Sequence, residues 1–173
     1  RFSMSPRREE RLLARAEAAR QVMEVLSTGQ DVTFITEGDP LLYSTFQYLL
    51  AALPSGAPVE ICPSISSLMA SAAEACFPLA IEEDRMVVAA ANPEVVRCLP
   101  GWLETFEVII LFKVHRHAKA LQAALKENNY VHRAALVQHA TLAGQAAVVD
   151  LDSWDGSPLP YFTMLLIRTK RQA

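Results

Sequence analysis

DVTFITEGDPLLYSTFQYLL, residues 31–50, is the stretch that decides the fold. An apolar run of strand length, residues 32–36, ends in an acidic Gly-Asp-Pro turn. Residues 42–53 then follow with the spacing of an amphipathic helix. Parallel α/β proteins bind ligands in the crevice outside the carboxyl ends of their strands, and Gly38 would let the backbone approach a ligand closely. The stretch therefore predicts a strand, a ligand-binding turn and a helix.

The rest of the first half continues this α/β order. Residues 7–26 have the pattern of a long helix with Ser5 as its N-cap. Residues 59–62 predict a second short strand and residues 68–75 another helix. This alternation is the wiring of a parallel sheet with crossover helices. Because two short strands do not make such a sheet stable, we expect further strands before residue 1.

From about residue 81 the chain predicts a second α/β unit. Its expected helices cover residues 93–99 and 118–127, and its expected strands cover residues 85–90, 107–114, 134–138, 145–150 and 161–168. Only a loop with Pro and Gly separates the last two strands, so we expect them to pair antiparallel in a mixed sheet.

The predicted fold class is α/β, with two αβα-type domains and a cleft between them. Residues 1–80 would be the C-terminal portion of an N-terminal parallel α/β domain that is incomplete in this chain. Residues 81–173 would be a C-terminal mixed-sheet α/β domain.

Composition and charge argue against several classes of function. The 173 residues have a formal net charge of -3 and their basic residues are spread out, so no nucleic-acid partner is expected. The longest apolar runs are far shorter than the roughly 20 residues of a spanning helix, so no membrane is expected. The histidines are not at zinc-ligand spacing with any cysteine, so no metal site is expected. The three cysteines, Cys62, Cys76 and Cys98, predict buried, reduced thiols in a cytoplasmic protein.

Four segments together resemble the tetrapyrrole methylase family, whose members are S-adenosylmethionine-dependent enzymes of cobalamin and siroheme synthesis. EGDPLLYSTFQYL (37–49) and VEICPSISS (59–67) are similar to two donor-binding turns of the family. LFKVHRHAKALQAAL (111–125) and PYFTMLLI (160–167) resemble segments of its branch that acts on precorrin-2. A Gly-Asp-Pro turn alone is a weak signal, but four segments in the family's order are specific.

The resemblance implies an S-adenosylmethionine-dependent methyltransferase that acts at C20 of precorrin-2 or cobalt-precorrin-2, and a homodimer. Two alternatives for the function stay open: another corrin-ring methyltransferase of the family, or a non-catalytic ligand-binding fragment. The sequence departs from the family pattern twice. It lacks the family's Gly-x-Gly-Pro-Gly loop, and Ser64 stands where the second turn has glycine, which is tolerable if φ is below zero there.

The resemblance also implies contacts to the methyl donor on the first turn. These would come from Glu37, from the backbone of Gly38 and the carboxylate of Asp39, and from Leu42 as a lining residue. The alternative is a simple helix start, with Asp39 as N-cap and Pro40 in the first turn.

Further donor contacts are implied elsewhere. Ser66 and Ser67 match the second turn, with helix capping as the alternative. Lys113 and Ala140 lie where the family has donor-contacting residues, although an ordinary lysine after a strand and a tight turn would explain them equally well.

The candidates for catalysis and for acceptor binding are weaker. Glu37 and Tyr43 flank the first turn, and Glu37 could accept a proton from the acceptor, but a solvated carboxylate is the preferred interpretation. His115, Arg116 and His117 form a compact basic group that would orient the carboxylates of a tetrapyrrole. A solvated helix start explains this group equally well.

Overall fold

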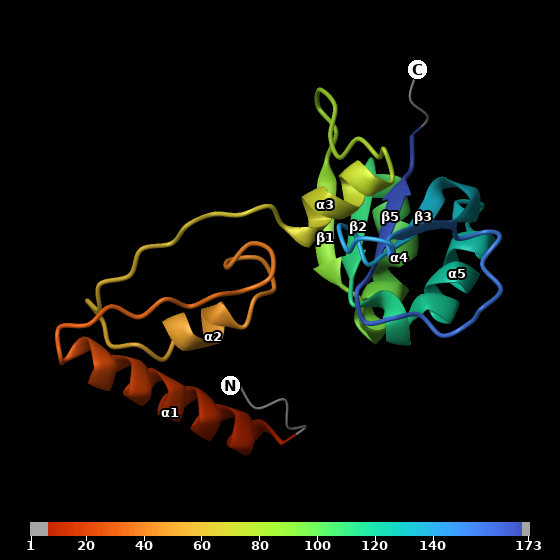
Figure 1. Cartoon of the computed structure of the whole chain (residues 1–173). Coiled ribbons are helices and arrows are strands. Elements are labelled where there is room, and N and C mark those ends of the chain that lie inside the picture. The colour runs from red at the N-terminus through yellow and green to blue at the C-terminus, as the bar shows by residue number, and fades with distance from the viewer. Residues whose placement is uncertain (1–6, 171–173) are drawn as a thin grey trace. The chain divides into compact units, whose positions relative to one another are not determined.

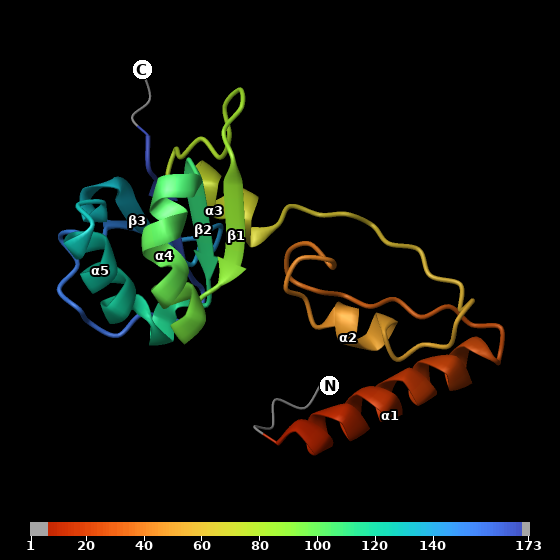
Figure 2. The same ribbon diagram turned by 180° about the vertical axis from the view of Figure 1, so that it is seen from behind.

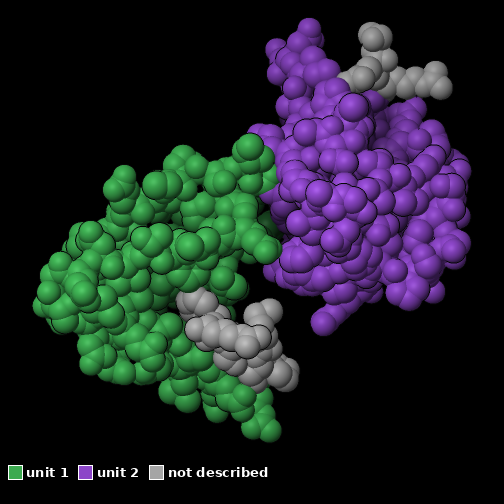
Figure 3. All heavy atoms as spheres, viewed as in Figure 1, with its two compact units in different colours: residues 1–66 green, residues 67–173 purple. Residues whose placement is uncertain are grey.

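The computed structural model describes residues 7–170 and is shown from two sides in Figures 1 and 2. The chain divides into two compact units, residues 1–66 (unit 1) and residues 67–173 (unit 2), coloured separately in Figure 3. The domain boundary predicted from the sequence lies near residue 80. The division lies earlier because helix α3, Ser67–Glu74, packs on the sheet of unit 2, where Ser71 Oγ lies 3.2 Å from Met164 Sδ.

Unit 1 contains two helices among its described residues. Helix α1 spans Arg8–Leu26, which confirms the predicted long helix, while the expected cap at Ser5 lies outside the described residues. Helix α2 spans only Phe46–Leu50, so the prediction of a helix over residues 42–53 is wrong at both ends. The backbone of Tyr43 has a φ of 54°, which an α-helix does not accommodate.

The strands predicted over residues 32–36 and 59–62 are not present in the described part of unit 1. A strand forms only when a neighbouring backbone supplies its hydrogen bonds, and both segments run as coil (Figure 2). Their apolar side chains are therefore only partly covered. Ile35 is 87% exposed, whereas Phe34 packs on Phe46 with ring centroids 5.3 Å apart. The expectation of further strands before residue 1 stays a prediction.

Unit 2 is built on a five-stranded mixed sheet in the order β1-β2-β5-β3-β4. The strands are β1 Met86–Ala90, β2 Val108–Phe112, β3 Ala134–Gln138, β4 Ala147–Asp150 and β5 Thr163–Arg168. Strands β1 and β2 are parallel, β5 runs antiparallel to both β2 and β3, and β4 runs antiparallel to β3. The α/β class and the mixed sheet are confirmed.

The prediction that the last two strands pair with each other is wrong. Strand β4 pairs with β3, and β5 inserts between β2 and β3, so that Leu165 lies opposite both Leu111 and Leu136. The burial of the side chains of β4 and β5 explains the order of the strands. Strand β5 is buried on both faces from Thr163 to Ile167 and needs a central position, whereas the mostly exposed β4 suits an edge.

Helices cover both faces of this sheet (Figures 1 and 2). Helices α4, Pro93–Thr105, and α5, Ala118–Glu127, pack on one face, and α3 packs on the other. Alternate residues of β2 face opposite cores, with Ile109 and Leu111 under α4 and α5 and Ile110 under α3. Two short 3₁₀ turns, η1 Val114–Arg116 and η2 Val131–Arg133, precede α5 and β3.

The prediction that the cysteines are buried is wrong. Cys62, Cys76 and Cys98 are free and exposed. Apolar neighbours in the sequence did not imply burial, because adjacent residues of a helix point in different directions. In α4, for example, Cys98 faces solvent while Leu99 is fully buried.

Candidate functional site

The two turns that the sequence singles out in unit 1 are joined by Asp39. Its Oδ1 accepts a hydrogen bond from the Leu41 N–H at 2.8 Å, and its Oδ2 accepts one from the Ser64 N–H at 3.1 Å. One half-buried carboxylate thus brings the Gly-Asp-Pro turn and the second predicted donor turn together. Ser64 is not among the residues with positive φ, so a non-glycine residue is accommodated there.

Asp39 is not the N-cap of a helix, because α2 begins only at Phe46 with Thr45 in the capping position. The alternative of a simple helix start at Asp39 and Pro40 is therefore wrong. Asp39 instead closes a turn in which the Leu42 N–H donates to its carbonyl oxygen at 3.4 Å. Each carboxylate oxygen has a second lone pair, so Asp39 keeps the capacity to accept from a ligand hydroxyl or ammonium.

The other candidates of the first turn lie on its surface. Gly38 has a φ of 69°, in the left-handed region where glycine pays no steric cost. Leu42 and Tyr43 are partly exposed, at 36% and 43%. Glu37 is exposed, as expected for a solvated carboxylate. The turn thus presents an exposed acid, an aromatic ring and an aliphatic side chain beside the half-buried Gly38.

Ser66 and Ser67 lie at the start of α3. Ser66 is half-buried and ends unit 1, while Ser67 is exposed and is the first residue of the helix. The first N–H groups of a helix have no intrahelical partner, so either a serine cap or a ligand oxygen can satisfy them. The position of Ser66 and Ser67 is therefore compatible both with contact to the methyl donor and with helix capping.

The candidates of unit 2 meet at one edge of its sheet. Strands β1, β2 and β3 run in the same direction, so their carboxyl ends lie together where β5 begins. Lys113 follows β2, while His139 and Ala140 follow β3. The His139 N–H donates to the Phe162 carbonyl oxygen at 2.9 Å and closes β3 onto the start of β5. The structure therefore brings Lys113 and Ala140 to the same edge.

The backbone at this edge is unusual. Lys113, His139 and Thr141 have φ values of 56°, 48° and 67°. Such left-handed conformations cost non-glycine residues on the order of 1–3 kcal/mol and gather at ligand-binding sites. The Lys113 side chain is exposed, and Ala140 is half-buried against the core under α3.

Sequence reasoning missed an aromatic row at this edge, which consists of His115, Tyr161, Phe162 and His139 in that order. The ring centroids are 5.3 Å apart for His115 and Tyr161, 5.4 Å for Tyr161 and Phe162, and 6.2 Å for Phe162 and His139. The Tyr-Phe pair before an apolar strand was a visible signal. Only the strand order places it between the two histidines.

His115 differs from the cation that the sequence suggested. Burial lowers its pKa, and the neighbouring charges of Arg116 and His117 lower the pKa further. His115 is therefore neutral at neutral pH, and Arg116 is the permanent cation of the predicted basic group. The buried Nδ1 atoms of His115 and His139 have no hydrogen-bond partner within residues 7–170.

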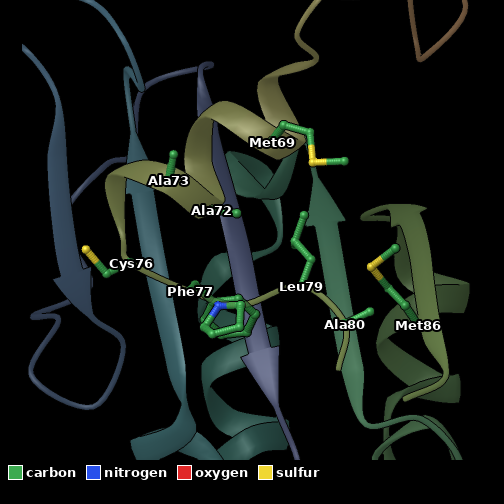
Figure 4. Close-up of a pocket in the computed structure, with 9 residues that line it drawn as sticks. Met69, Ala72, Ala73, Cys76, Phe77, Leu79, Ala80 and Met86 are labelled. Carbon is green, nitrogen blue, oxygen red and sulfur yellow. The ribbon is translucent and has the colours of Figure 1, made fainter. Parts of the chain in front are cut away.

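A separate open hollow of about 560 Å³ lies in unit 2 beside α3 (Figure 4). Its lining is apolar, with Met69 from α3 and Met86 from β1 at its border and Cys76 as its titratable group. None of the predicted site residues lines it. We therefore assign no chemistry to this hollow.

Two classes of site find no support in the described residues. No helix there is long and apolar enough to cross a membrane. No three His, Cys, Asp or Glu side chains in this part of the chain gather into a group that could hold a metal ion.

The sequence pattern of the tetrapyrrole (corrin/porphyrin) methylases matches residues 1–152. The chain belongs to this family. The family predicted from the four segments is confirmed, and the match covers the Asp39 turn together with Lys113 and Ala140 of unit 2.

Relatives with curated names resemble the chain over most of its length. It is 32% identical over 168 residues to a cobalt-precorrin-2 C(20)-methyltransferase of Salmonella typhimurium, covering 96% of this chain and 70% of that protein. It is 28% identical over 153 residues to a precorrin-2 C(20)-methyltransferase of Sinorhizobium, covering 87% of this chain and 60% of that protein.

Solved structures show the same fold. The methyltransferase CobJ superposes with a TM-score of 0.69 at 20% identity, over 92% of this chain and 74% of that chain. A uroporphyrin-III C-methyltransferase of Thermus thermophilus in complex with S-adenyl homocysteine superposes with a TM-score of 0.61 at 15% identity, over 88% of this chain and 72% of that chain.

Proposed function

We propose that this chain is an S-adenosylmethionine-dependent C-methyltransferase that methylates C20 of precorrin-2, or of cobalt-precorrin-2, in cobalamin biosynthesis. The observation that carries the proposal is that the chain is 32% identical, over 96% of its length, to a protein named cobalt-precorrin-2 C(20)-methyltransferase. A methyltransferase acting on another corrin intermediate has less support, because the likeness to a cobalt precorrin-4 methyltransferase is at 19% identity and concerns the fold alone.

Methyl transfer from a sulfonium to a carbon is an in-line displacement. The donor C–S bond breaks as the new C–C bond forms, S-adenosylhomocysteine leaves, and the methylated carbon then loses a proton. Positioning of two reactants can supply about 7–11 kcal/mol of barrier reduction in favourable cases. The protein therefore needs mainly to hold donor and acceptor and to exclude water.

The Asp39 turn suits the polar ends of the methyl donor. The free lone pairs of the Asp39 carboxylate would accept hydrogen bonds from an ammonium or from ribose hydroxyls. Gly38 allows close backbone approach, and Leu42 would contact the apolar part of the donor. Ser66 and Ser67 add hydroxyl and amide groups at the start of α3.

The remaining candidates have narrower roles in this proposal. Lys113 and Ala140 would contact the donor at the edge of the unit 2 sheet, as the family resemblance implies. Arg116, aided by His117, would pair with acceptor carboxylates. Glu37 is the candidate to take up the proton that the methylated carbon loses, and the exposed Tyr43 is the second, weaker candidate for a catalytic role.

We expect this enzyme to act in the cytoplasm as a homodimer. Size-exclusion chromatography with light scattering measures the second expectation directly. A monomer mass at working concentration would contradict it.

The position of the new methyl group tests the proposed function. The protein is incubated with precorrin-2 and, separately, with cobalt-precorrin-2, each with donor labelled by ¹³C at the methyl, and the products are analysed by NMR. The label is expected at C20. A label at another carbon would support the alternative within the family. No transfer, together with no heat on titration with S-adenosylhomocysteine, would indicate a non-catalytic protein.

A further inference from the structure

We infer that the aromatic row of unit 2 is the surface on which the acceptor macrocycle stacks, with Tyr161 and Phe162 as residues that determine acceptor affinity. The inference rests on the proposed function, because it takes the acceptor to be a conjugated ring that carries carboxylates. It gives a role to two side chains of the PYFTMLLI segment that the family resemblance does not assign to either ligand.

Tyr161 and Phe162 are large aromatic side chains that stay 54% and 51% exposed. Their rings are nevertheless fixed by neighbours, because Tyr161 meets His115 at an interplanar angle of 60° and Phe162 meets His139 at 65°. The two rings meet each other at 75°. Such tilted contacts are favourable for aromatic pairs, so the row is an ordered apolar surface with room for another ring.

The backbone under the row is held from both sides. The Phe162 carbonyl oxygen accepts from the His139 N–H at 2.9 Å, and the buried Thr163 hydroxyl donates to the Pro160 carbonyl oxygen at 2.7 Å. Thr163 is also paired with Gln138 of β3. A ligand that stacks here therefore loses little free energy to ordering of the site.

A permanent cation at the row suits an acceptor that carries carboxylates. The η1 turn packs beside β5 and carries the exposed Arg116. A flat ring with carboxylates at its rim could place the ring on Tyr161 and Phe162 and one of its acids on Arg116.

The histidines at the two ends of the row point to a polar ligand as well. The Nδ1 atoms of His115 and His139 are buried without a hydrogen-bond partner in the described part of the chain. A buried polar atom without a partner costs on the order of 1–3 kcal/mol. Small movements of these rings toward a bound carboxylate or pyrrole group would recover part of that cost.

The test uses the full chain with uroporphyrin as the probe, a stable flat tetrapyrrole with carboxylates at its rim, followed by fluorescence titration. Tyr161→Leu and Phe162→Leu remove one ring each. Each is expected to weaken uroporphyrin binding about tenfold and to leave the S-adenosylhomocysteine affinity, measured by calorimetry, unchanged. Tyr161→Phe and Phe162→Tyr keep a ring and should bind like the wild type.

Tyr130→Leu is the matched control, since Tyr130 is half-buried and precedes η2 and β3, at the opposite edge of the sheet. It should bind uroporphyrin like the wild type. Arg116→Gln provides a second route if a leucine variant does not fold, because Arg116 is exposed. It should weaken uroporphyrin binding and reduce the salt dependence of that binding.

Three results would overturn the inference: no uroporphyrin binding by the wild type, unchanged binding in both leucine variants, or a loss of S-adenosylhomocysteine affinity in place of uroporphyrin affinity. The last result would assign the row to the donor. Failure of the proposed function is distinguishable. A wild type that binds uroporphyrin on this row but places no methyl at C20 contradicts only the reaction, whereas C20 methylation with unaffected variants contradicts only the row.

Discussion

At the scale of single residues, Asp39 and His115 make the most distinctive contacts in the candidate sites. Asp39 uses both carboxylate oxygens to hold two turns that are far apart in the sequence. His115 is a neutral imidazole packed edge-on against Tyr161. Each residue makes a measurable prediction, because its environment differs from that of an exposed side chain.

Replacing Asp39 should disconnect the two turns of unit 1. In Asp39→Ala the amides of Leu41 and Ser64 lose their acceptor, and hydrogen bonds to a charged group contribute about 1.5–3 kcal/mol each. We expect the affinity for S-adenosylhomocysteine, measured by calorimetry, to fall at least tenfold. Asp31→Ala removes an exposed acid of the same unit and should bind like the wild type. Equal affinities in the two variants would contradict the role given to Asp39.

His115 should make stability depend on pH in the weakly acidic range. Its pKa in the folded protein lies below the ordinary 6.5, so the unfolded chain binds a proton first as the pH falls. The free energy of unfolding therefore decreases below about pH 6.5. Thermal unfolding of His115→Gln should lose less stability between pH 7.5 and pH 5.5 than the wild type does. Equal slopes in the wild type and the variant would rule the idea out.

At the scale of elements, a buried carboxylate ties three strands together at the edge opposite the aromatic row. Glu107 directly precedes β2, and its side chain is 5% exposed. Its Oε2 accepts from the Arg85 backbone N–H at 2.9 Å, and its Oε1 accepts from Arg85 Nη2 at 3.0 Å and from Lys170 Nζ at 2.8 Å. Arg85 precedes β1 and Lys170 follows β5, so one acid links β1, β2 and β5.

Glu107→Gln should lower the melting temperature at neutral pH, because the Arg85 pair loses its charged partner. Hydrogen bonds from Arg85 and Lys170 hold the pKa of Glu107 well below its ordinary value of 4.5. The stabilisation is therefore fully present above about pH 4.5 and is lost as the pH falls below it. The difference in melting temperature between wild type and variant, measured by circular dichroism, should shrink from pH 7 to pH 3. Glu104→Gln, an exposed acid of α4, serves as the control and should melt like the wild type.

At the scale of the whole molecule, the two units differ in how much core they have. The buried apolar residues of unit 1 are Ala19, Phe46 and Leu49 among those described. Unit 2 buries apolar side chains on both faces of its sheet. Because net stability is a small difference between burial and chain entropy, the larger core should dominate the folding of the chain.

Separate expression of the units tests this. Residues 67–173 should fold alone and unfold cooperatively in urea, as followed by circular dichroism. Residues 1–66 alone should show no cooperative transition, because their few buried side chains cannot offset the entropy of ordering the chain. A cooperative transition in the short fragment, or none in the long one, would contradict the assignment.

The sequence by itself determined the elements whose signals are local. The periodic helices α1 and α5 and the apolar β3 were predicted to within a residue at their ends, since side-chain spacing along one segment suffices for that. The Gly-Asp-Pro turn and the following motifs also determined the family, and they pointed to Asp39, Lys113 and Ala140 as candidates.

Only the tertiary structure decided what depends on partners distant in the chain. Residues 32–36 have a strand's composition but no ladder in the described structure, because a strand requires a neighbour to take its hydrogen bonds. The insertion of β5 between β2 and β3 follows from its burial on both faces, which is a property of the packed sheet. That insertion is also what places Tyr161 and Phe162 between His115 and His139, so the aromatic row exists only in three dimensions.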